Sequence, residues 1–151
     1  AHRRAWRPGA GAGAGGGGLG GGGGGRTAHG YSGFVVIIED SWGYCFGGVV
    51  TEPLRESPNY FGRGDCFVYR FHPSFEAYRW SGRNEFFVLC TAEHLAMGGG
   101  GGGFAFQVDD ELDTGVSSSS ETFGNPQLSS SQFFKVLNVE VYTLEHVAMA
   151  I

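Results

Sequence analysis

The chain has 151 residues, enough for one domain, and its 10 basic and 15 acidic residues give a formal net charge of −5. Arg3, Arg4, Arg7 and Arg26 precede residue 30 and every acidic residue follows it, so residues 30–151 carry a net charge of −9. This charge argues against a nucleic-acid-binding domain, which needs a basic face. No apolar run approaches the ~18 residues that span a membrane.

Residues 1–29 have the composition of a disordered basic tail. Glycine fills most of the stretch from Gly9 to Gly25, and the segment offers too little apolar surface to offset the entropy of ordering. Arginine-rich, acid-free N-termini also occur in organelle transit peptides, but those are serine-rich and amphipathic. The sequence does not start with methionine, so we expect its natural N-terminus to be missing. The folded domain is predicted over residues 30–151.

The first strong element of this domain is a β-hairpin. Residues 34–38 form a continuous run of Phe, Val and Ile, which is typical of a strand buried on both faces. Asp40-Ser41-Trp42-Gly43 predicts a tight turn, and residues 44–50 then supply the second strand.

A second hairpin and two short helices are expected farther along the chain. The segments 76–80 and 85–90 flank Ser81-Gly82-Arg83-Asn84, which has the composition of a hairpin turn. Residues 91–96 predict one or two helical turns with Thr91 as the cap, and residues 129–133 predict another short helix.

The remaining segments have the pattern of short strands. Apolar residues alternate with small or polar ones over residues 104–108 and again over 137–142. Several short strands separated by turn signals predict a mostly β fold with short helices, arranged as a two-sheet antiparallel sandwich.

Six consecutive glycines, Gly98 to Gly103, lie between segments with strong core character. Ordering six glycines costs much backbone entropy, so a folded domain keeps them where it needs positive φ angles or a close approach of two backbones. A phosphate-binding loop would continue as Gly-Lys-Ser/Thr into a helix, whereas this one leads into a strand at Phe104. A structural loop is the favoured interpretation.

Two other patterns resemble ligand or catalytic sites only in part. Asp109, Glu111 and Asp113 occupy positions 1, 3 and 5 of a calcium loop, but Thr114 and Ser120 stand where Gly and Glu are needed. A solvated acidic turn is the favoured interpretation. The serine run 117–120 lacks a Gly-x-Ser-x-Gly elbow, and the histidines and cysteines have no zinc-ligand spacing. We therefore expect no cofactor and no metal.

The three cysteines, Cys45, Cys66 and Cys90, show no paired spacing. An odd count in strand-like segments favours reduced thiols that pack as small hydrophobic residues. A redox-active thiol is the alternative, but no Lys, Arg or His stands beside any of them in sequence to lower its pKa.

Glu121 stands at the start of the turn-rich segment Glu121-Thr122-Phe123-Gly124-Asn125-Pro126. A carboxylate in such surroundings is expected to be buried, where it needs backbone N–H donors or an Arg partner. Glu52 precedes Pro53 at the end of a strand. Neither has a nearby base, nucleophile or metal ligand, so a role in structure or partner binding is favoured over catalysis.

Taken together, these segments resemble the TLDc domain of eukaryotic oxidation-resistance proteins. The resemblance extends over residues 30–144 and rests on the order and spacing of its pieces. They are Phe46-Gly47-Gly48, Glu52-Pro53, residues 60–67, Tyr78-Arg79-Trp80-Ser81-Gly82-Arg83-Asn84, Leu95-Ala96-Met97 with the glycine loop, residues 121–129, and Val139-Glu140-Val141-Tyr142.

The chain departs from the family pattern at a few positions. Asp65 replaces the usual Glu, Tyr142 replaces Trp, and Ser120 replaces Cys. The opening strand and helix of the family, with their Ser-x-x-His-Gly-like stretch, have no counterpart, and the glycine-rich tail occupies their place.

The resemblance implies a two-sheet antiparallel sandwich flanked by short helices, and a non-enzymatic role in oxidative-stress resistance. It also implies a protein partner, the peripheral sector of the vacuolar proton-pumping ATPase. We expect a cytoplasmic location by default, including endolysosomal or vacuolar membranes reached through that partner. A net charge of −9 suits a basic docking surface. Direct protection through cysteine oxidation is the alternative function. The candidates for partner binding or structure are Glu52, Trp80, Asn84, Glu121 and Asn125.

Overall fold

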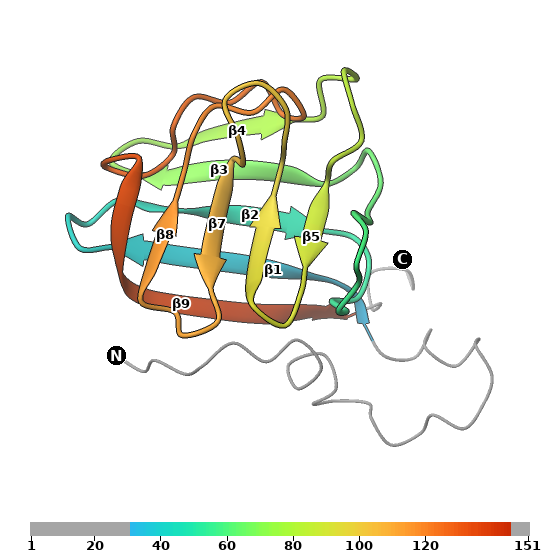
Figure 1. Ribbon diagram of the computed structural model, residues 1–151, viewed down its shortest axis with the longest axis horizontal. Helices are drawn as coiled ribbons and strands as arrows, with labels where there is room; N and C mark the ends of the chain where they lie inside the picture. Colours follow the sequence, from blue (N-terminus) through green and yellow to red (C-terminus); the bar gives the residue numbers. More distant parts are fainter. Residues whose placement is uncertain (1–30, 146–151) are drawn as a thin grey trace.

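The structure, a computed structural model, describes residues 31–145 (Figure 1). The tail expected over residues 1–29 lies outside the described residues, so that prediction stays open. The described part consists of strands joined by turns and loops. The strands are β1 (Tyr31–Asp40), β2 (Cys45–Val50), β3 (Phe67–His72), β4 (Glu76–Arg79), β5 (Val88–Cys90), β6 (His94–Met97), β7 (Phe106–Asp109), β8 (Thr114–Val116) and β9 (Phe133–Glu145).

All strand pairs are antiparallel, and the strands form one continuous sheet in the order β4-β3-β2-β1-β9-β8-β7-β6-β5. The long strand β9 joins the two halves, because Phe133–Lys135 pair with β8 and residues 136–145 pair with β1. Figure 1 shows β5, β7 and β8 crossing over the layer that contains β1 to β4. The expected mostly β, antiparallel sandwich is confirmed, with β9 common to both layers.

The core lies between the two layers. In β1 the alternate residues Phe34, Val36 and Ile38 are buried, whereas the residues between them are only partly buried. Phe46 packs edge-on against Phe106, with ring centroids 6.4 Å apart, and against Phe134 at 5.1 Å. Burial of such aromatic side chains is the main favourable contribution to the stability of a domain of this size.

The predicted first hairpin is confirmed, since β1 pairs with β2 from Phe34↔Val50 to Glu39↔Cys45. The predicted second hairpin is wrong. β4 pairs with β3 and β5 pairs with β6, so the two segments lie at opposite edges of the sheet. The turn between them bonds to another segment instead, with the Ser81 N–H donating to the Thr122 carbonyl at 2.8 Å.

The predicted short helices are not found in the described residues. The Thr91 hydroxyl does accept N–H bonds from Glu93 and His94, at 3.1 and 3.2 Å, but it caps a turn and the chain continues as β6. Leu95 and Met97 in β6 are buried between β5 and β7, and this sheet pairing overrides the local helical preference.

The second expected helix, over residues 129–133, is also replaced. The Ser129 hydroxyl donates to the Ser131 carbonyl at 2.5 Å, and the Ser131 hydroxyl donates to the Phe133 carbonyl at 2.7 Å. Serine side chains that bond to nearby backbone in this way compete with helix formation. Residues 31–145 contain no helix of the length and apolar character that a membrane span requires.

Candidate functional site

The glycine loop Gly98–Gly103 connects β6 to β7 and is central to the candidate site. The Ala105 N–H donates to the Met97 carbonyl at 2.8 Å, which closes the base of the loop. The φ angle is positive at Gly98, Gly100, Gly101 and Gly103. Residues with a Cβ rarely adopt these conformations. The predicted need for unusual dihedrals is confirmed.

The same loop also shows the predicted close approach to other segments. A Cβ on Gly99 would lie 3.0 Å from Cβ of Phe86 and 3.1 Å from the Tyr60 hydroxyl. On the other side, a Cβ on Gly102 would lie 2.9 Å from Oγ of Ser119. The loop is therefore packed between the segment before β5 and the serine run, and a Cβ at either contact would force a neighbouring side chain to shift.

Asn84 and Thr122 connect these flanking segments to the loop. The Thr122 hydroxyl donates to Asn84 Oδ1 at 2.5 Å and accepts the Gly99 N–H at 3.0 Å. Asn84 Oδ1 also accepts the Phe86 N–H at 3.1 Å. The polar atoms of this network are used to hold three chain segments together. Sequence reasoning did not single out Thr122; its only signal is its place in the turn-rich segment that begins at Glu121.

Glu121 lies against the glycine loop, but its carboxylate is not buried. Its backbone N–H donates to the Gly99 carbonyl at 3.0 Å, and its carbonyl accepts from the Ser81 hydroxyl at 2.6 Å. The carboxylate pairs with Arg83 at 3.6 Å, and the side chain is 41% exposed. The expectation of a buried carboxylate is therefore wrong, whereas the expected kind of partner, an arginine, is present.

An exposed ion pair of this length contributes little to stability. We expect Glu121→Gln to change the free energy of unfolding by no more than about 0.5 kcal/mol, since solvent screens both charges. Thermal unfolding of the two proteins at equal pH checks this. A loss of several degrees in melting temperature would instead indicate that the carboxylate accepts backbone N–H bonds in solution.

Trp80 covers the edge of this cluster. Its Nε1–H donates to the Asn84 carbonyl at 2.7 Å, and its ring packs at 5.4 Å from the ring of Phe87. A Cβ on Gly64 would come within 2.4 Å of the indole, so the loop before β3 passes directly beside it. The indole remains partly exposed.

Asn125 is buried and packs against the serine run at residues 117–120. Its Oδ1 accepts from the Ser120 hydroxyl at 2.6 Å, and its Nδ2 donates to the carbonyls of Ser118 and Pro126 at 3.1 and 2.7 Å. With its amide fully used, Asn125 fixes the loop on which Glu121 stands. The structure therefore gathers Trp80, Asn84, Glu121 and Asn125 around one loop system.

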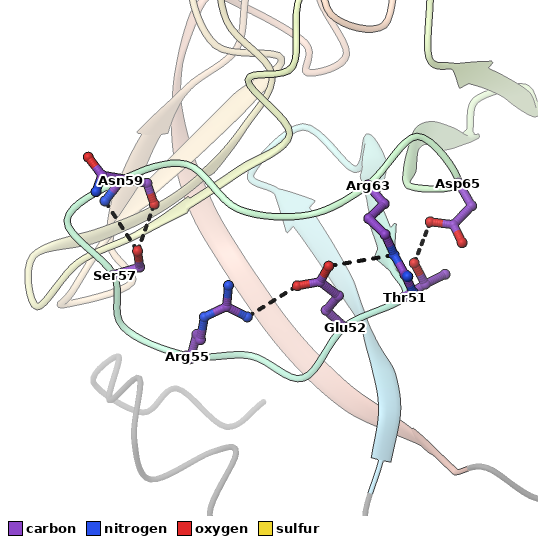
Figure 2. Close-up of polar contacts among 7 residues, drawn as sticks. All are labelled: Thr51, Glu52, Arg55, Ser57, Asn59, Arg63 and Asp65. Atoms are coloured by element: carbon purple, nitrogen blue, oxygen red, sulfur yellow. Dashed lines mark hydrogen bonds and ion pairs between the residues drawn. The ribbon is translucent and has the colours of Figure 1, made fainter. Parts of the chain in front are cut away.

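Glu52 lies apart from the other candidates, in the loop between β2 and β3 (Figure 2). Its carboxylate pairs with Arg55 at 3.2 Å and with Arg63 at 3.6 Å, while the Thr51 hydroxyl donates to Asp65 at 2.5 Å. These contacts join the two ends of the loop. Glu52 stabilises the loop in this structure, and its ion pairs are both made within that loop.

The loop at Gly100 allows a direct test of the structural interpretation. Gly100 has φ +81°, and a Cβ there would lie 2.8 Å from Asn84 Nδ2 and 2.9 Å from Glu121 Oε1. We expect Gly100→Val to destabilise the fold by about 1–3 kcal/mol, because strain and steric overlap add. Chemical denaturation measures the change. Gly82→Ala, at φ +85° with no atom within 4 Å of the added Cβ, is the control for strain alone.

The three thiols are buried or partly buried. Cys66 and Cys90 are buried, and burial raises the pKa of the Cys66 thiol. Burial, followed by the charges of Glu39 and Asp40, raises the pKa of the Cys45 thiol. A raised pKa keeps a thiol protonated at neutral pH, and the protonated form reacts slowly with oxidants.

The acidic run folds as the turn between β7 and β8. Asp109 Oδ1 accepts the Asp113 N–H at 3.1 Å, and Oδ2 accepts from the Thr114 hydroxyl at 3.2 Å. These bonds use the first carboxylate of the supposed calcium loop to hold the turn. Within residues 31–145 no group of three or more His, Cys, Asp or Glu side chains is placed to hold a metal ion.

The strands form an antiparallel β-sandwich in which the glycine loop Gly98–Gly103 organises the candidate site. This sandwich belongs to a known sequence family. Residues 26–145 match the TLDc domain, so the chain belongs to the TLDc domain family. The chain is 41% identical over 111 residues to oxidation resistance protein 1 of Homo sapiens, covering 74% of this chain and 13% of that protein. It is 40% identical over 111 residues to nuclear receptor coactivator 7 of Gallus gallus, covering 74% of this chain and 12% of that protein. The chain thus spans about an eighth of the length of these relatives.

Proposed function

We propose that this chain is a non-enzymatic protein-interaction module that acts in oxidative-stress resistance in the cytoplasm. Its proposed partner is the peripheral sector of the vacuolar proton-pumping ATPase. The observation that carries the proposal is membership of the TLDc family, with relatives named oxidation resistance protein 1 at 38–41% identity.

The chemistry of the candidate site supports binding over turnover. The amide of Asn125 and the hydroxyl of Thr122 are committed to holding backbone segments, and the carboxylate of Glu121 pairs with Arg83. None of these groups forms the nucleophile and base pair that a catalytic site needs.

The charge of the domain supports a basic docking surface on the partner. Residues 30–151 carry a net charge of −9. Such a charge accelerates encounter with a basic surface and discourages encounter with an acidic one. Binding driven in this way weakens as salt is raised, since the Debye length falls from about 10 Å at 0.1 M to 3 Å at 1 M.

Binding of the full chain to the purified peripheral sector of the vacuolar ATPase tests the proposal. We expect the immobilised chain to retain the complex at low salt and to release it as salt rises. An unrelated β-sandwich domain of equal net charge is the control. Retention no greater than that of the control domain would exclude docking by this chain.

Direct protection by the cysteines is the competing function. We expect the triple variant Cys45→Ser/Cys66→Ser/Cys90→Ser to protect peroxide-treated cells as well as the unchanged chain does. The physical reason is the raised pKa of the Cys45 and Cys66 thiols and the burial of Cys66 and Cys90.

Thiol mass measured after peroxide treatment of the purified chain gives a second readout. Slow oxidation of all three thiols is the expected result. Loss of protection by the triple variant, with the fold intact by circular dichroism, would favour the antioxidant function over docking.

A further inference from the structure

Four exposed aromatic side chains are grouped at one end of the sheet, which we call the aromatic end. Trp42 is 81% exposed, Phe133 72%, Phe75 65% and Phe71 62%. Trp42 lies in the β1–β2 turn, Phe71 and Phe75 flank the β3–β4 turn, and Phe133 begins β9. Exposed apolar clusters on a soluble domain commonly mark interaction sites.

The three chain segments of the aromatic end are held side by side. The Ser41 N–H donates to the Lys135 carbonyl at 2.9 Å, which ties the β1–β2 turn to the start of β9. Cys45 is paired with His72, so the same turn adjoins the end of β3. Figure 1 shows both turns and the start of β9 at the same end of the molecule.

The backbone itself directs two of these rings outward. Between β2 and β3 the register passes from Phe46↔Arg70 to Cys45↔His72, so Phe71 is the extra residue of a β-bulge. Bulges redirect side chains and occur often next to functional sites. Trp42 stands on a turn whose N–H groups at Trp42 and Tyr44 are bound by the buried Asp40 carboxylate, at 2.9 and 3.0 Å. The indole is therefore exposed on a backbone that is already ordered.

We propose that the aromatic end is the surface through which this domain docks on another protein. The partner offers an apolar recess surrounded by basic side chains. Aromatic anchors on an ordered backbone lose little conformational entropy on binding and commonly dominate the energy of an interface. This inference rests on the proposed function as an interaction module, and it specifies the surface and the chemistry of the partner.

The negative charge of the domain favours a basic protein partner over two alternatives, a second copy of the chain and a membrane surface. The net charge of −9 over residues 30–151 disfavours contact with the same residues of a second copy and with the anionic surface of a cytoplasmic membrane leaflet. Phe133 also lines a shallow hollow of about 410 Å³ together with Asp109, Thr114 and Lys135. This hollow gives a partner side chain a place to insert beside the ring of Phe133.

Three probes test the inference with the full chain. They are the purified peripheral sector of the vacuolar ATPase, an amphipathic helical peptide with leucines on one face and lysines on the other, and vesicles of phosphatidylcholine with phosphatidylserine. The variant is Trp42→Ser/Phe71→Ser/Phe75→Ser. Tyr142→Ser is the matched control, because Tyr142 is also an exposed aromatic residue but pairs with Val35, five residues along β1 from Asp40 at the aromatic end. Circular dichroism verifies the fold of both variants.

We expect the triple variant to weaken binding of the ATPase sector or of the leucine–lysine peptide by about tenfold or more, and the control to leave it unchanged. If the peptide binds in this way but the ATPase sector does not bind at all, the inference holds and the proposed partner is wrong. If the ATPase sector binds both variants equally, the proposed function stands and the inference is overturned.

Three further results would also overturn the inference. The first is that neither the ATPase sector nor the leucine–lysine peptide binds the chain. The second is that the chain binds the vesicles and the triple variant does not. The third is that the chain self-associates in sedimentation and the triple variant does not. A peptide of the same apolar face with glutamate in place of lysine is the charge control. We expect it to bind at least tenfold more weakly than the lysine peptide.

Discussion

Gly47→Ala is expected to destabilise this domain severely, although it adds only one methyl group. Gly47 lies in β2, and a Cβ at this position would be 1.8 Å from the Val36 carbonyl oxygen and 2.9 Å from the Tyr69 hydroxyl. The Tyr69 hydroxyl donates to that same carbonyl at 2.7 Å. The obstacle is therefore a paired strand and a fixed hydrogen bond, neither of which can move aside cheaply.

We expect a loss of about 3–5 kcal/mol in the free energy of unfolding, at the upper end of overpacking effects. Such a loss lowers the melting temperature by roughly 10 °C or more in a domain of this size. Gly124→Ala is the matched control, because Gly124 has φ +60° and no atom lies within 4 Å of an added Cβ. The control is expected to lose only about 1 kcal/mol. Equal losses in the two variants would refute the steric explanation.

The hydrogen bond donated by the Tyr69 hydroxyl stabilises the fold only over a defined pH range. Burial raises the pKa of Tyr69 to about 12, from the usual 10. Because the folded pKa lies above the unfolded one, the stabilising contribution is complete below pH 10 and is lost as the pH rises through 12. The packing around Gly47 is therefore unaffected by titration of this group at neutral pH.

Asp40→Ala is expected to have the second large effect. Asp40 is fully buried, and its Oδ1 accepts the N–H groups of Trp42 and Tyr44 at 2.9 and 3.0 Å. Its Oδ2 accepts the Ser130 N–H at 2.8 Å, which ties the β1–β2 turn to the loop before β9. Removal leaves three backbone donors without their acceptor. We expect a loss of about 3–5 kcal/mol, because unsatisfied buried donors cost about 1–3 kcal/mol each and water will reach some of them.

Hydrogen exchange gives this prediction a local readout. The amides of Trp42, Tyr44 and Ser130 are expected to exchange faster in Asp40→Ala, together with a lower melting temperature. Asp109→Ala is the control, since Asp109 makes similar bonds in the partly exposed β7–β8 turn and is expected to cost about 1 kcal/mol. Comparable losses at the two positions would mean that burial of the Asp40 carboxylate is not what makes it important.

Local sequence patterns predicted the parts of the fold that depend on near neighbours. The β-branched run at residues 34–38 and the turn at Asp40 to Gly43 predicted the first hairpin correctly. The glycine run predicted a loop with positive φ angles and close packing. The helical predictions failed at residues 91–96, because pairing of β6 on both edges is a long-range effect that a local pattern does not contain.

The candidate site was predicted only as a set of residues, without its geometry. The sequence indicated Trp80, Asn84, Glu121 and Asn125, and the structure gathers them around the glycine loop. The sequence grouped Glu52 with them, whereas its ion pairs belong to the loop between β2 and β3. The exposure of Glu121 was also missed, because burial depends on which segments cover a turn.

By itself, the sequence determined the family, the β character and the glycine loop at residues 98–103, since these depend on residue type and short-range geometry. The tertiary structure alone decided that β4 and β5 lie at opposite edges of the sheet and that β9 joins the two layers. It alone brought Trp42, Phe71, Phe75 and Phe133 to one end, although up to 91 positions separate them in the chain. The physical reason is that strand pairing and bulges set these neighbours, and both depend on contacts between distant segments.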